Sequence, residues 1–151
     1  MVRLWSLTAL VALASATTAV DSSHRLTLTK EEGLKQALEI KANQTDDEPQ
    51  LGRRQSSFGR YCDNWDFSGP CVYHRFSIDN IGHYIGGDWN DRISSVEGFD
   101  ADKRCIYWTE YSADSGGYCY GDGLIVNGGD RFPQLGWPYN DRISCHQCSW
   151  R

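Results

Sequence analysis

The sequence predicts an all-β fold in which two Greek-key motifs form a disulfide-stapled sandwich. Short runs rich in aromatic and branched residues, such as CVYHRF and CIYWTEY, are typical of strands. Turn signals containing glycine separate these runs about every 8–12 residues, which favours a small sandwich or barrel. The string NDRIS occurs at 90–94 and again at 140–144. A string repeated at a fixed period indicates two similar units, each of about 45 residues and four short strands.

Residues 1–19 have the pattern of a secretory signal peptide. Arg3 provides a basic start, Leu4–Leu13 is an apolar run, and Ala14–Ala16 offers the small residues that signal peptidase reads. The run is too short to span a bilayer, and the alternative is a buried core helix. No later segment is apolar enough to be a membrane anchor. We therefore expect a secreted, extracellular protein.

Residues 20–54 are interpreted as a pro-segment. Thr29 and Glu32 have the spacing of a helix capping box, and the apolar spacing after them favours one short amphipathic helix. The segment has no cysteine and no aromatic residue, and it ends at the dibasic pair Arg53-Arg54. So little apolar surface cannot form a core alone. Cleavage after the pair is expected, and the alternative is a linker that stays attached.

The remaining chain, residues 55–151, is the predicted domain, and cleavage would leave Gln55 as its first residue. It holds all six cysteines and 18 of the 19 aromatic residues. Its 13 acidic residues outnumber its 8 basic ones. Nucleic-acid binding needs a basic surface, so this balance excludes that class and suits a cation or a neutral glycan. A domain of this size buries a modest core, which disulfides usually supplement in secreted proteins.

The even number of cysteines indicates three disulfide bonds. The six are Cys62, Cys71, Cys105, Cys119, Cys145 and Cys148. The symmetry of the repeats predicts the pairs Cys62–Cys71, Cys105–Cys119 and Cys145–Cys148. The rival scheme has a long-range bridge from Cys145 or Cys148 to an N-terminal cysteine. The spacing of CHQC also suits zinc, which an oxidising compartment disfavours.

The two halves resemble the βγ-crystallin superfamily in its small secreted microbial form. Each half has an aromatic hairpin, WDFSG or YSADSGG, followed by an Asn/Asp-Asn/Asp-x-x-Ser loop. NDRISS fits all six positions of the family's calcium motif, and NDRISC fits five, with Cys145 where serine is usual. The resemblance covers roughly residues 61–148. It implies two Greek keys and calcium binding.

The resemblance implies one or two calcium sites in the NDRIS loops. The expected metal residues are Asn90, Asp91, Arg92 and Ser94 in the first loop and Asn140, Asp141, Arg142 and Ser144 in the second. Each loop offers a carboxylate, a hydroxyl and the backbone carbonyl of its arginine, which are ligands that calcium prefers. The resemblance completes the first site with residues 108–110 and the second with 64–66. The alternative is a purely structural turn, because Asn-Asp pairs favour turns.

Enzyme chemistry has little support in the sequence. No Gly-x-Ser-x-Gly or His-Glu-x-x-His motif occurs, and His74, His83 and His146 lack a motif partner. Glu97 and Glu110 are expected to be surface acids. We therefore expect a binding protein rather than an enzyme.

The expected function is that of a secreted calcium-binding module acting outside the cell as an effector, toxin or antimicrobial protein. Calcium is its expected partner, together with an extracellular protein or a cell-wall glycan. The first alternative is a proteinase inhibitor, whose candidate loop is Gly121–Gly136. The second is binding of a glycan such as chitin, through exposed indoles. The candidates are Trp65, Trp89, Trp108, Trp137 and Trp150.

Overall fold

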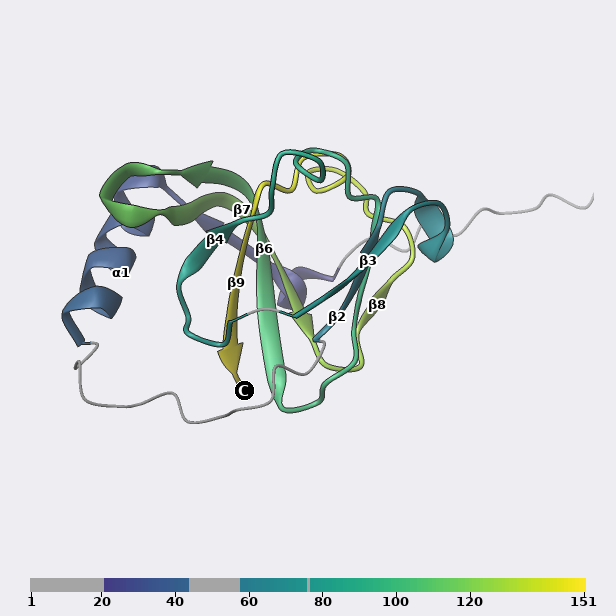
Figure 1. The fold of residues 1–151 in the computed structure, drawn as a ribbon, viewed down its shortest axis with the longest axis horizontal. Coiled ribbons are helices and arrows are strands. Elements are labelled where there is room, and N and C mark those ends of the chain that lie inside the picture. The colour runs from purple at the N-terminus through teal and green to yellow at the C-terminus, as the bar shows by residue number, and fades with distance from the viewer. Residues whose placement is uncertain (1–20, 44–57, 76) are drawn as a thin grey trace, which may run out of the picture.

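The computed structural model describes residues 21–43, 58–75 and 77–151 (Figure 1). The predicted signal peptide, the pair Arg53-Arg54 and Gln55 lie outside the described residues, so processing stays a prediction. In the part of the chain that is described, no helix is long and apolar enough to cross a membrane.

Two antiparallel sheets pack against each other in a sandwich (Figure 1). The four-stranded sheet has the order β3 (Cys71–His74), β2 (Gly59–Cys62), β5 (Ser95–Gly98) and β8 (Arg131–Phe132). The five-stranded sheet has the order β1 (Arg25–Leu28), β7 (Tyr118–Asn127), β6 (Lys103–Ser112), β9 (Cys145–Trp150) and β4 (Gly82–Tyr84). One α-helix, α1 (Lys30–Asn43), and the 3-10 turns η1 (Ser22–His24), η2 (Trp65–Phe67) and η3 (Asp114–Gly116) complete the described elements.

The two repeats exchange their third strands. In the first repeat β2, β3 and β5 share a sheet, whereas β4 pairs with β9 of the second repeat. In the second repeat β6, β7 and β9 share the other sheet, whereas β8 pairs with β5 of the first. This is an arrangement of two interlocked Greek keys, and it confirms the predicted fold class.

The core between the sheets takes one isoleucine from each NDRIS loop. Ile93 and Ile143 are fully buried in the same apolar cluster as Tyr107 and Leu124. Fully burying a side chain of this kind stabilises the fold by about 1.5–3 kcal/mol. The middle of each NDRIS string is therefore part of the core, and the polar residues around it are held at the surface.

Three disulfide bonds brace the sandwich, and one has the predicted pairing. Cys62–Cys71 closes the hairpin of β2 and β3, as predicted. The predicted pairs Cys105–Cys119 and Cys145–Cys148 are wrong, because the bonds are Cys105–Cys148 and Cys119–Cys145. Both cysteines of CHQC are thus oxidised rather than available to zinc.

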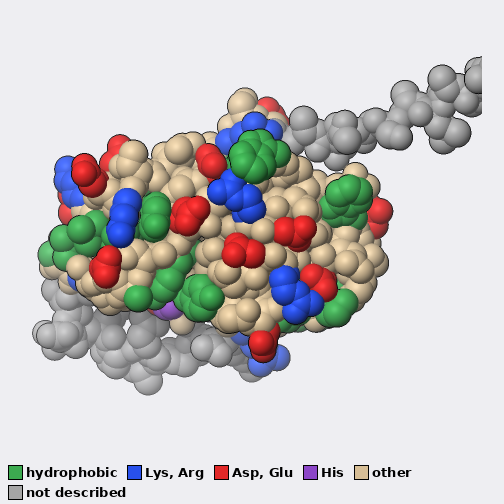
Figure 2. Space-filling model, turned by 90° about the horizontal axis from the view of Figure 1, so that it is seen from above, with side chains coloured by type: hydrophobic (Ala, Val, Ile, Leu, Met, Phe, Trp, Pro, Cys, Tyr) green, Lys and Arg blue, Asp and Glu red, His purple; other side chains and the backbone are tan. Residues whose placement is uncertain are grey.

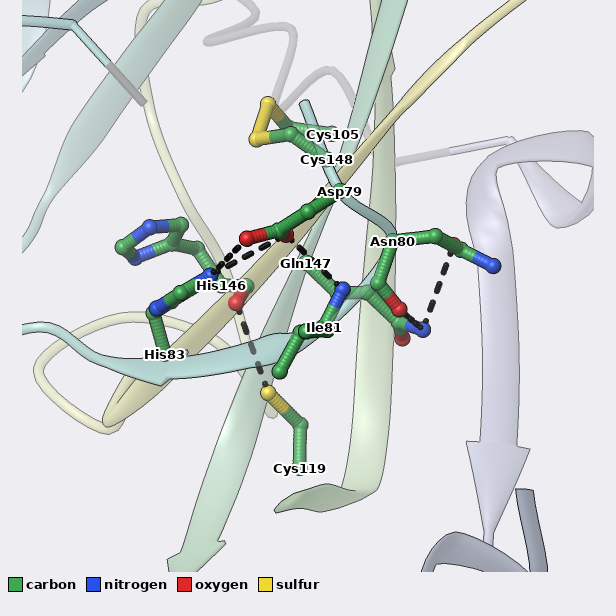
Figure 3. Close-up of polar contacts among 9 residues, drawn as sticks. All are labelled: Asp79, Asn80, Ile81, His83, Cys105, Cys119, His146, Gln147 and Cys148. Atoms are coloured by element: carbon green, nitrogen blue, oxygen red, sulfur yellow. Dashed lines mark hydrogen bonds and ion pairs between the residues drawn. A yellow bond between two sulfur atoms is a disulfide. The ribbon is translucent and has the colours of Figure 1, made fainter. Parts of the chain in front are cut away.

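Strand register explains the pairing. Cys105 lies directly opposite Cys148 in the β6–β9 pair, with 4.1 Å between their Cα atoms, but opposite Val126 in the β6–β7 pair. The register of the β6–β7 pair shifts between Trp108 and Glu110, and the part of the hairpin after this shift contains Cys119. This part lies against Gly82 of β4, where Cys119 is within reach of Cys145. Figure 3 shows the Cys105–Cys148 bond above Asp79, with Cys119 on the other side of Ile81.

Helix α1 begins at the predicted capping box. The N–H of Glu32 donates to Thr29 Oγ1 at 3.2 Å, and the N–H of Thr29 donates to the Glu32 carboxylate at 2.8 Å. The predicted helix is confirmed. The sequence did not predict that the same segment adds β1 to the edge of the five-stranded sheet.

Two further expectations about surface groups are wrong. Glu97 is only 5% exposed, and its carboxylate is clamped by Arg60 at 2.6 Å and Arg131 at 2.9 Å. The region Gly121–Gly136 is not one long loop, because its first seven residues belong to β7.

Candidate functional site

The two NDRIS loops lie side by side at one end of the sandwich, at the top of Figure 1. The N–H of Asp91 donates to the carbonyl of Ile143 at 3.2 Å, and the N–H of Asp141 donates to the carbonyl of Ile93 at 3.1 Å. These two backbone hydrogen bonds are thus equivalent, one from each repeat. The loops fix each other through backbone hydrogen bonds.

The aspartate and serine side chains cross between the repeats. Ser94 Oγ donates to Asp141 Oδ1 at 3.0 Å, and Ser144 Oγ donates to Asp91 Oδ1 at 3.3 Å. The sequence predicted a site in which each serine lies with the aspartate of its own loop. The structure places it with the aspartate of the other loop, so each candidate site is built from both halves of the chain.

The asparagine before each aspartate orients the carboxylate. Asn90 Nδ2 donates to Asp91 Oδ2 at 2.6 Å, and Asn140 Nδ2 donates to Asp141 Oδ2 at 2.7 Å. Both aspartates have positive φ values, 57° and 52°. Asp and Asn adopt this left-handed conformation more readily than other residues with a side chain. The residue types of the motif therefore suit the turn as well as an ion.

One of the two sites is an open concavity of about 480 Å³. Its walls are Asn64, Trp65, Asp66, Ser68, Ser94, Asn140 and Asp141. The indole N–H of Trp65 donates to Asn140 Oδ1 at 3.1 Å, which joins the first hairpin to the second loop. This agrees with the expectation that residues 64–66 face the second NDRIS loop. Figure 2, which views the molecule from the loop side, shows acidic side chains near the middle of this face with basic ones among them.

Ser95, the sixth residue of the complete motif, supports this open site. Its hydroxyl donates to the carbonyl of Asn64 at 2.7 Å and accepts from the N–H of Phe67 at 3.2 Å. It therefore pins the first hairpin, which faces Asp141. The equivalent residue in the second repeat is Cys145, which is bound to Cys119 instead. The intact first motif thus shapes the site that holds the second aspartate.

The arginines of both loops turn their side chains to acids on the hairpins. Arg92 binds Asp63 at 2.7 Å, and Arg142 lies 3.7 Å from Glu110. The hydrogen bond and charge of Asp63 raise the pKa of Arg92. Each loop is thereby also tied to a hairpin through a surface ion pair.

The five candidate tryptophans have different environments. Trp65 and Trp137 are 53% and 79% exposed, whereas Trp108 is 2% exposed and packs in a small cluster with Cys119 and Cys145. The guanidinium of Arg142 lies 4.8 Å from the Trp137 ring. Trp89 is partly buried against the core, and Trp150 is partly exposed.

The histidines form a second polar cluster that sequence reasoning missed. His83 Nε2 lies 3.0 Å from the Asp79 carboxylate and the His83 ring stacks on His146 (Figure 3). The hydrogen bond to Asp79 raises the pKa of His83, although burial lowers it in part. Burial, and then the charge of His83, lowers the pKa of His146 to about 3. Burial likewise lowers the pKa of His74, whose Nε2 lies 2.7 Å from Tyr107 Oη.

No family model and no curated protein matches the sequence. Two solved structures match the fold. One is the N-terminal domain of protein S, at 20% identity and a TM-score of 0.43, with 61% of this chain and 94% of that chain covered. The other is a βγ-crystallin domain from Flavobacterium johnsoniae, at 18% identity and a TM-score of 0.45, with 62% and 96% covered. The chain is similar to βγ-crystallin domains. The likeness concerns the fold alone.

Proposed function

We propose that this chain is a secreted calcium-binding module that acts by binding outside the cell, as an effector, toxin or antimicrobial protein rather than as an enzyme. The observation that carries the calcium site is the crossing of the two loops. Ser94 and Asp141 meet across the repeats, and a hairpin with further oxygen groups closes the same concavity. Secretion is supported by three disulfide bonds, which persist in oxidising compartments.

The groups around the open site fit calcium by their chemistry. Calcium takes six to eight oxygen ligands and tolerates irregular geometry. Asp66 and Asp141 offer carboxylates, Ser94 offers a hydroxyl and Asn140 offers an amide oxygen. In the described residues, no group of three or more His, Cys, Asp or Glu side chains could hold a metal. Backbone carbonyls and water would have to supply the remaining ligands, so we expect a dissociation constant on the order of micromolar to millimolar.

The open site is expected to bind calcium more strongly than the site of Asp91. On sequence alone the complete motif NDRISS predicts that the first loop, with Asp91, dominates. We infer the opposite order, because the extra serine of that motif, Ser95, orders the hairpin opposite Asp141. At the other site the corresponding hairpin carries Trp108, which is buried.

Calcium at this position would fasten the two repeats together. Its ligands come from both NDRIS loops and from a hairpin, so the complete site exists only in the folded chain. A ligand that binds only the folded state raises stability by about 2.7 kcal/mol at a hundredfold excess over its dissociation constant. For a domain of about 100 residues this corresponds to a melting shift of roughly 10–20 °C.

Thermal unfolding of the chain in millimolar calcium, compared with a chelator, tests the proposal. We expect the melting temperature to rise with calcium and to rise little with magnesium, which demands a tighter octahedron. Asp141→Asn should remove most of this rise. Asp102→Asn removes an exposed acid in the turn before β6, and it is the matched control because it changes the net charge by the same amount. Identical melting curves in calcium and chelator would leave the loops as structural turns only.

Glycan binding is the second candidate function, and the exposure of two indoles favours it. Trp65 lines the open concavity and Trp137 lies three residues before Asn140, with 79% of its surface exposed. Indole rings stack on apolar faces of ligands while their N–H groups bind polar atoms. Titration with chitin oligosaccharides should quench tryptophan fluorescence, and Trp137→Ala should abolish most of the change. Trp150→Ala, an exposed indole on β9, is the control.

A further inference from the structure

The edge of the five-stranded sheet is covered by the segment that the sequence marks for removal. Strand β1 pairs with β7 from Arg25 opposite Leu124 to Leu28 opposite Gly121. Without β1, this part of β7 would be an edge strand with unpaired backbone N–H and C=O groups. Such an edge is a template for pairing with another strand.

Helix α1 continues the cover over the start of β7. Its Gly33 is buried, and a Cβ atom added there would lie 2.7 Å from the carbonyl oxygen of Cys119 and 3.1 Å from the Tyr118 ring. Glycine inside a helix costs about 1 kcal/mol relative to alanine. The close approach to β7 explains why glycine stands at this position. Ile81 and Gly82, at the start of β4, also face the helix across a cavity of about 10 Å³.

Polar contacts to acids on the covered surface orient the segment. His24 lies 3.2 Å from Asp130 and Lys30 lies 3.7 Å from Asp114. Lys41 Nζ also donates to the carbonyl of Ser115. Exposed ion pairs contribute little stability. They show that the covered surface presents Asp114 and Asp130 to basic side chains, although residues 21–43 hold four acidic and four basic residues overall.

The segment binds as an extended strand with few apolar anchors. Leu28 packs against the cluster of Trp108, Cys119 and Cys145, whereas Leu26 is exposed. On α1, Leu34, Ala37 and Ile40 are half-buried. A strand and a helix whose apolar side chains are buried only in part depend on the covalent link for a high effective concentration. Cleavage at Arg53-Arg54 would remove that link.

We propose that residues 21–43 are a removable cap, and that the surface beneath them is where the mature domain docks an extended polypeptide strand with basic side chains opposite Asp114 and Asp130. The docking surface consists of the outer edge of Gly121–Leu124 and the adjoining groove between β4 and the β6–β7 hairpin. Backbone pairing would give the affinity, as in other cases of strand addition, and the pocket of Leu28 would take one apolar side chain. The proposal uses the predicted cleavage and is independent of calcium.

Hydrogen exchange of the folded chain, before and after a cut in the link, tests the cap. The cut is made by a dibasic-specific protease or, in a variant with an inserted recognition sequence in place of residues 48–54, by the matching protease. We expect the amides of Gly121–Leu124 to be protected in the intact chain. They should exchange at least about tenfold faster once the cap has been removed by dilution and gel filtration. A synthetic peptide of residues 21–43 should restore the protection.

Two peptide variants separate docking from helix propensity. Gly33→Ala raises helix propensity but places a Cβ against β7, so it should bind at least about tenfold more weakly. Ala42→Gly lowers helix propensity at an exposed position and should retain most of the affinity. A peptide with Lys30→Glu and Lys41→Glu should bind more weakly than the wild-type peptide at low salt.

Four results would overturn the proposal. They are fast exchange of Gly121–Leu124 in the intact chain, unchanged protection after the cap is gone, a cap that cannot be removed by dilution, and equal binding of the Gly33→Ala peptide. Dimerisation of the cut domain through β7, seen by sedimentation, would also overturn it, because a second copy would then be the occupant. None of these results depends on whether the NDRIS loops bind calcium.

Discussion

Ser94 donates a hydrogen bond to the carboxylate of Asp141 at 3.0 Å, across 47 positions of the sequence. The two residues belong to different copies of the same five-residue string. The repeat therefore does more than mark two similar units, because each copy supplies half of a shared polar centre.

The calcium response should depend more on Asp141 than on Asp91. Asp141→Asn keeps a residue that tolerates positive φ and removes the negative charge, so the turn should persist while ion binding is lost. We expect it to remove most of the calcium-induced rise in melting temperature and Asp91→Asn to remove a smaller part. Calcium titrations followed by thermal unfolding give the comparison. A larger loss from Asp91→Asn would show that the completeness of the first motif, rather than the open concavity, sets the affinity.

The serine–aspartate pairs should be energetically coupled across the repeats. A double-mutant cycle of Ser94→Ala with Asp141→Asn should give an interaction energy of about 0.5 kcal/mol or more. The cycle of Ser144→Ala with Asp141→Asn is the control and should give a value near zero. The free energies of unfolding are measured in a chelator, so that calcium does not contribute. Coupling within a loop instead of between loops would contradict the crossed geometry.

Non-reduced peptide mapping should join Cys105 to Cys148 and Cys119 to Cys145. The second bond spans 26 positions, and chain-entropy arguments give it a value of about 3–4 kcal/mol. The double variant Cys119→Ala with Cys145→Ser should lower stability by that order. Denaturant unfolding of this variant beside wild type measures the loss. Recovery of a peptide joining Cys105 to Cys119 would show that symmetry, not register, determines the pairing.

Acid should destabilise the fold through its buried histidines. The pKa of His146 is about 3 in the folded chain and that of His74 is also lowered, so the unfolded state binds more protons below about pH 6.5. Stability carried by these groups is present above the unfolded pKa and is lost as the pH falls toward the folded pKa. The raised pKa of His83 acts in the opposite direction, because its pair with Asp79 is fully formed below the unfolded pKa and is lost as pH rises.

As the pH falls from about 6 to about 4, the free energy of unfolding should decrease by on the order of 1 kcal/mol per pH unit. His146→Gln should flatten this dependence. His83→Gln should change the profile above about pH 6.5, where the pair of His83 with Asp79 is lost as the pH rises. Denaturant midpoints measured from about pH 4 to about pH 8 separate the two effects. A flat profile in the wild type would contradict the burial of neutral histidines as the dominant effect.

Mass spectrometry of the secreted protein should show a chain that begins at Gln55. Arg53→Ala with Arg54→Ala should keep residues 20–54 attached, because the dibasic signal is gone. Replacing Lys30 and Lys35 by alanine leaves the pair intact and serves as the control. If residues 20–54 are still attached to the secreted wild-type chain, the predicted cleavage is wrong and the segment is a permanent part of the sandwich.

Local pattern predicted much of this structure, and long-range register explains what it missed. The capping box of Thr29 and Glu32 acts over three residues, so its helix could be read directly. The partner of Cys119 depends on where a hairpin ends relative to β4, which no local pattern specifies. The crossing of Ser94 to Asp141 likewise follows from the packing of two whole repeats. The strand β1 was missed because its pairing lies almost 100 positions away, at residues 121–124.

The exchange of third strands has a consequence for how the protein is made. During vectorial synthesis the first repeat emerges complete, yet β4 has no neighbour until β9, Cys145–Trp150, has followed. Pairings between such distant segments form slowly, because the chain between them must close first. The nascent first half must therefore wait with one sheet unfinished, and Cys105 must stay reduced until Cys148 has entered the oxidising compartment. Premature oxidation of Cys105 with Cys62, Cys71 or Cys119 would trap the chain, so in the proposed secretory route disulfide isomerase activity should govern its yield.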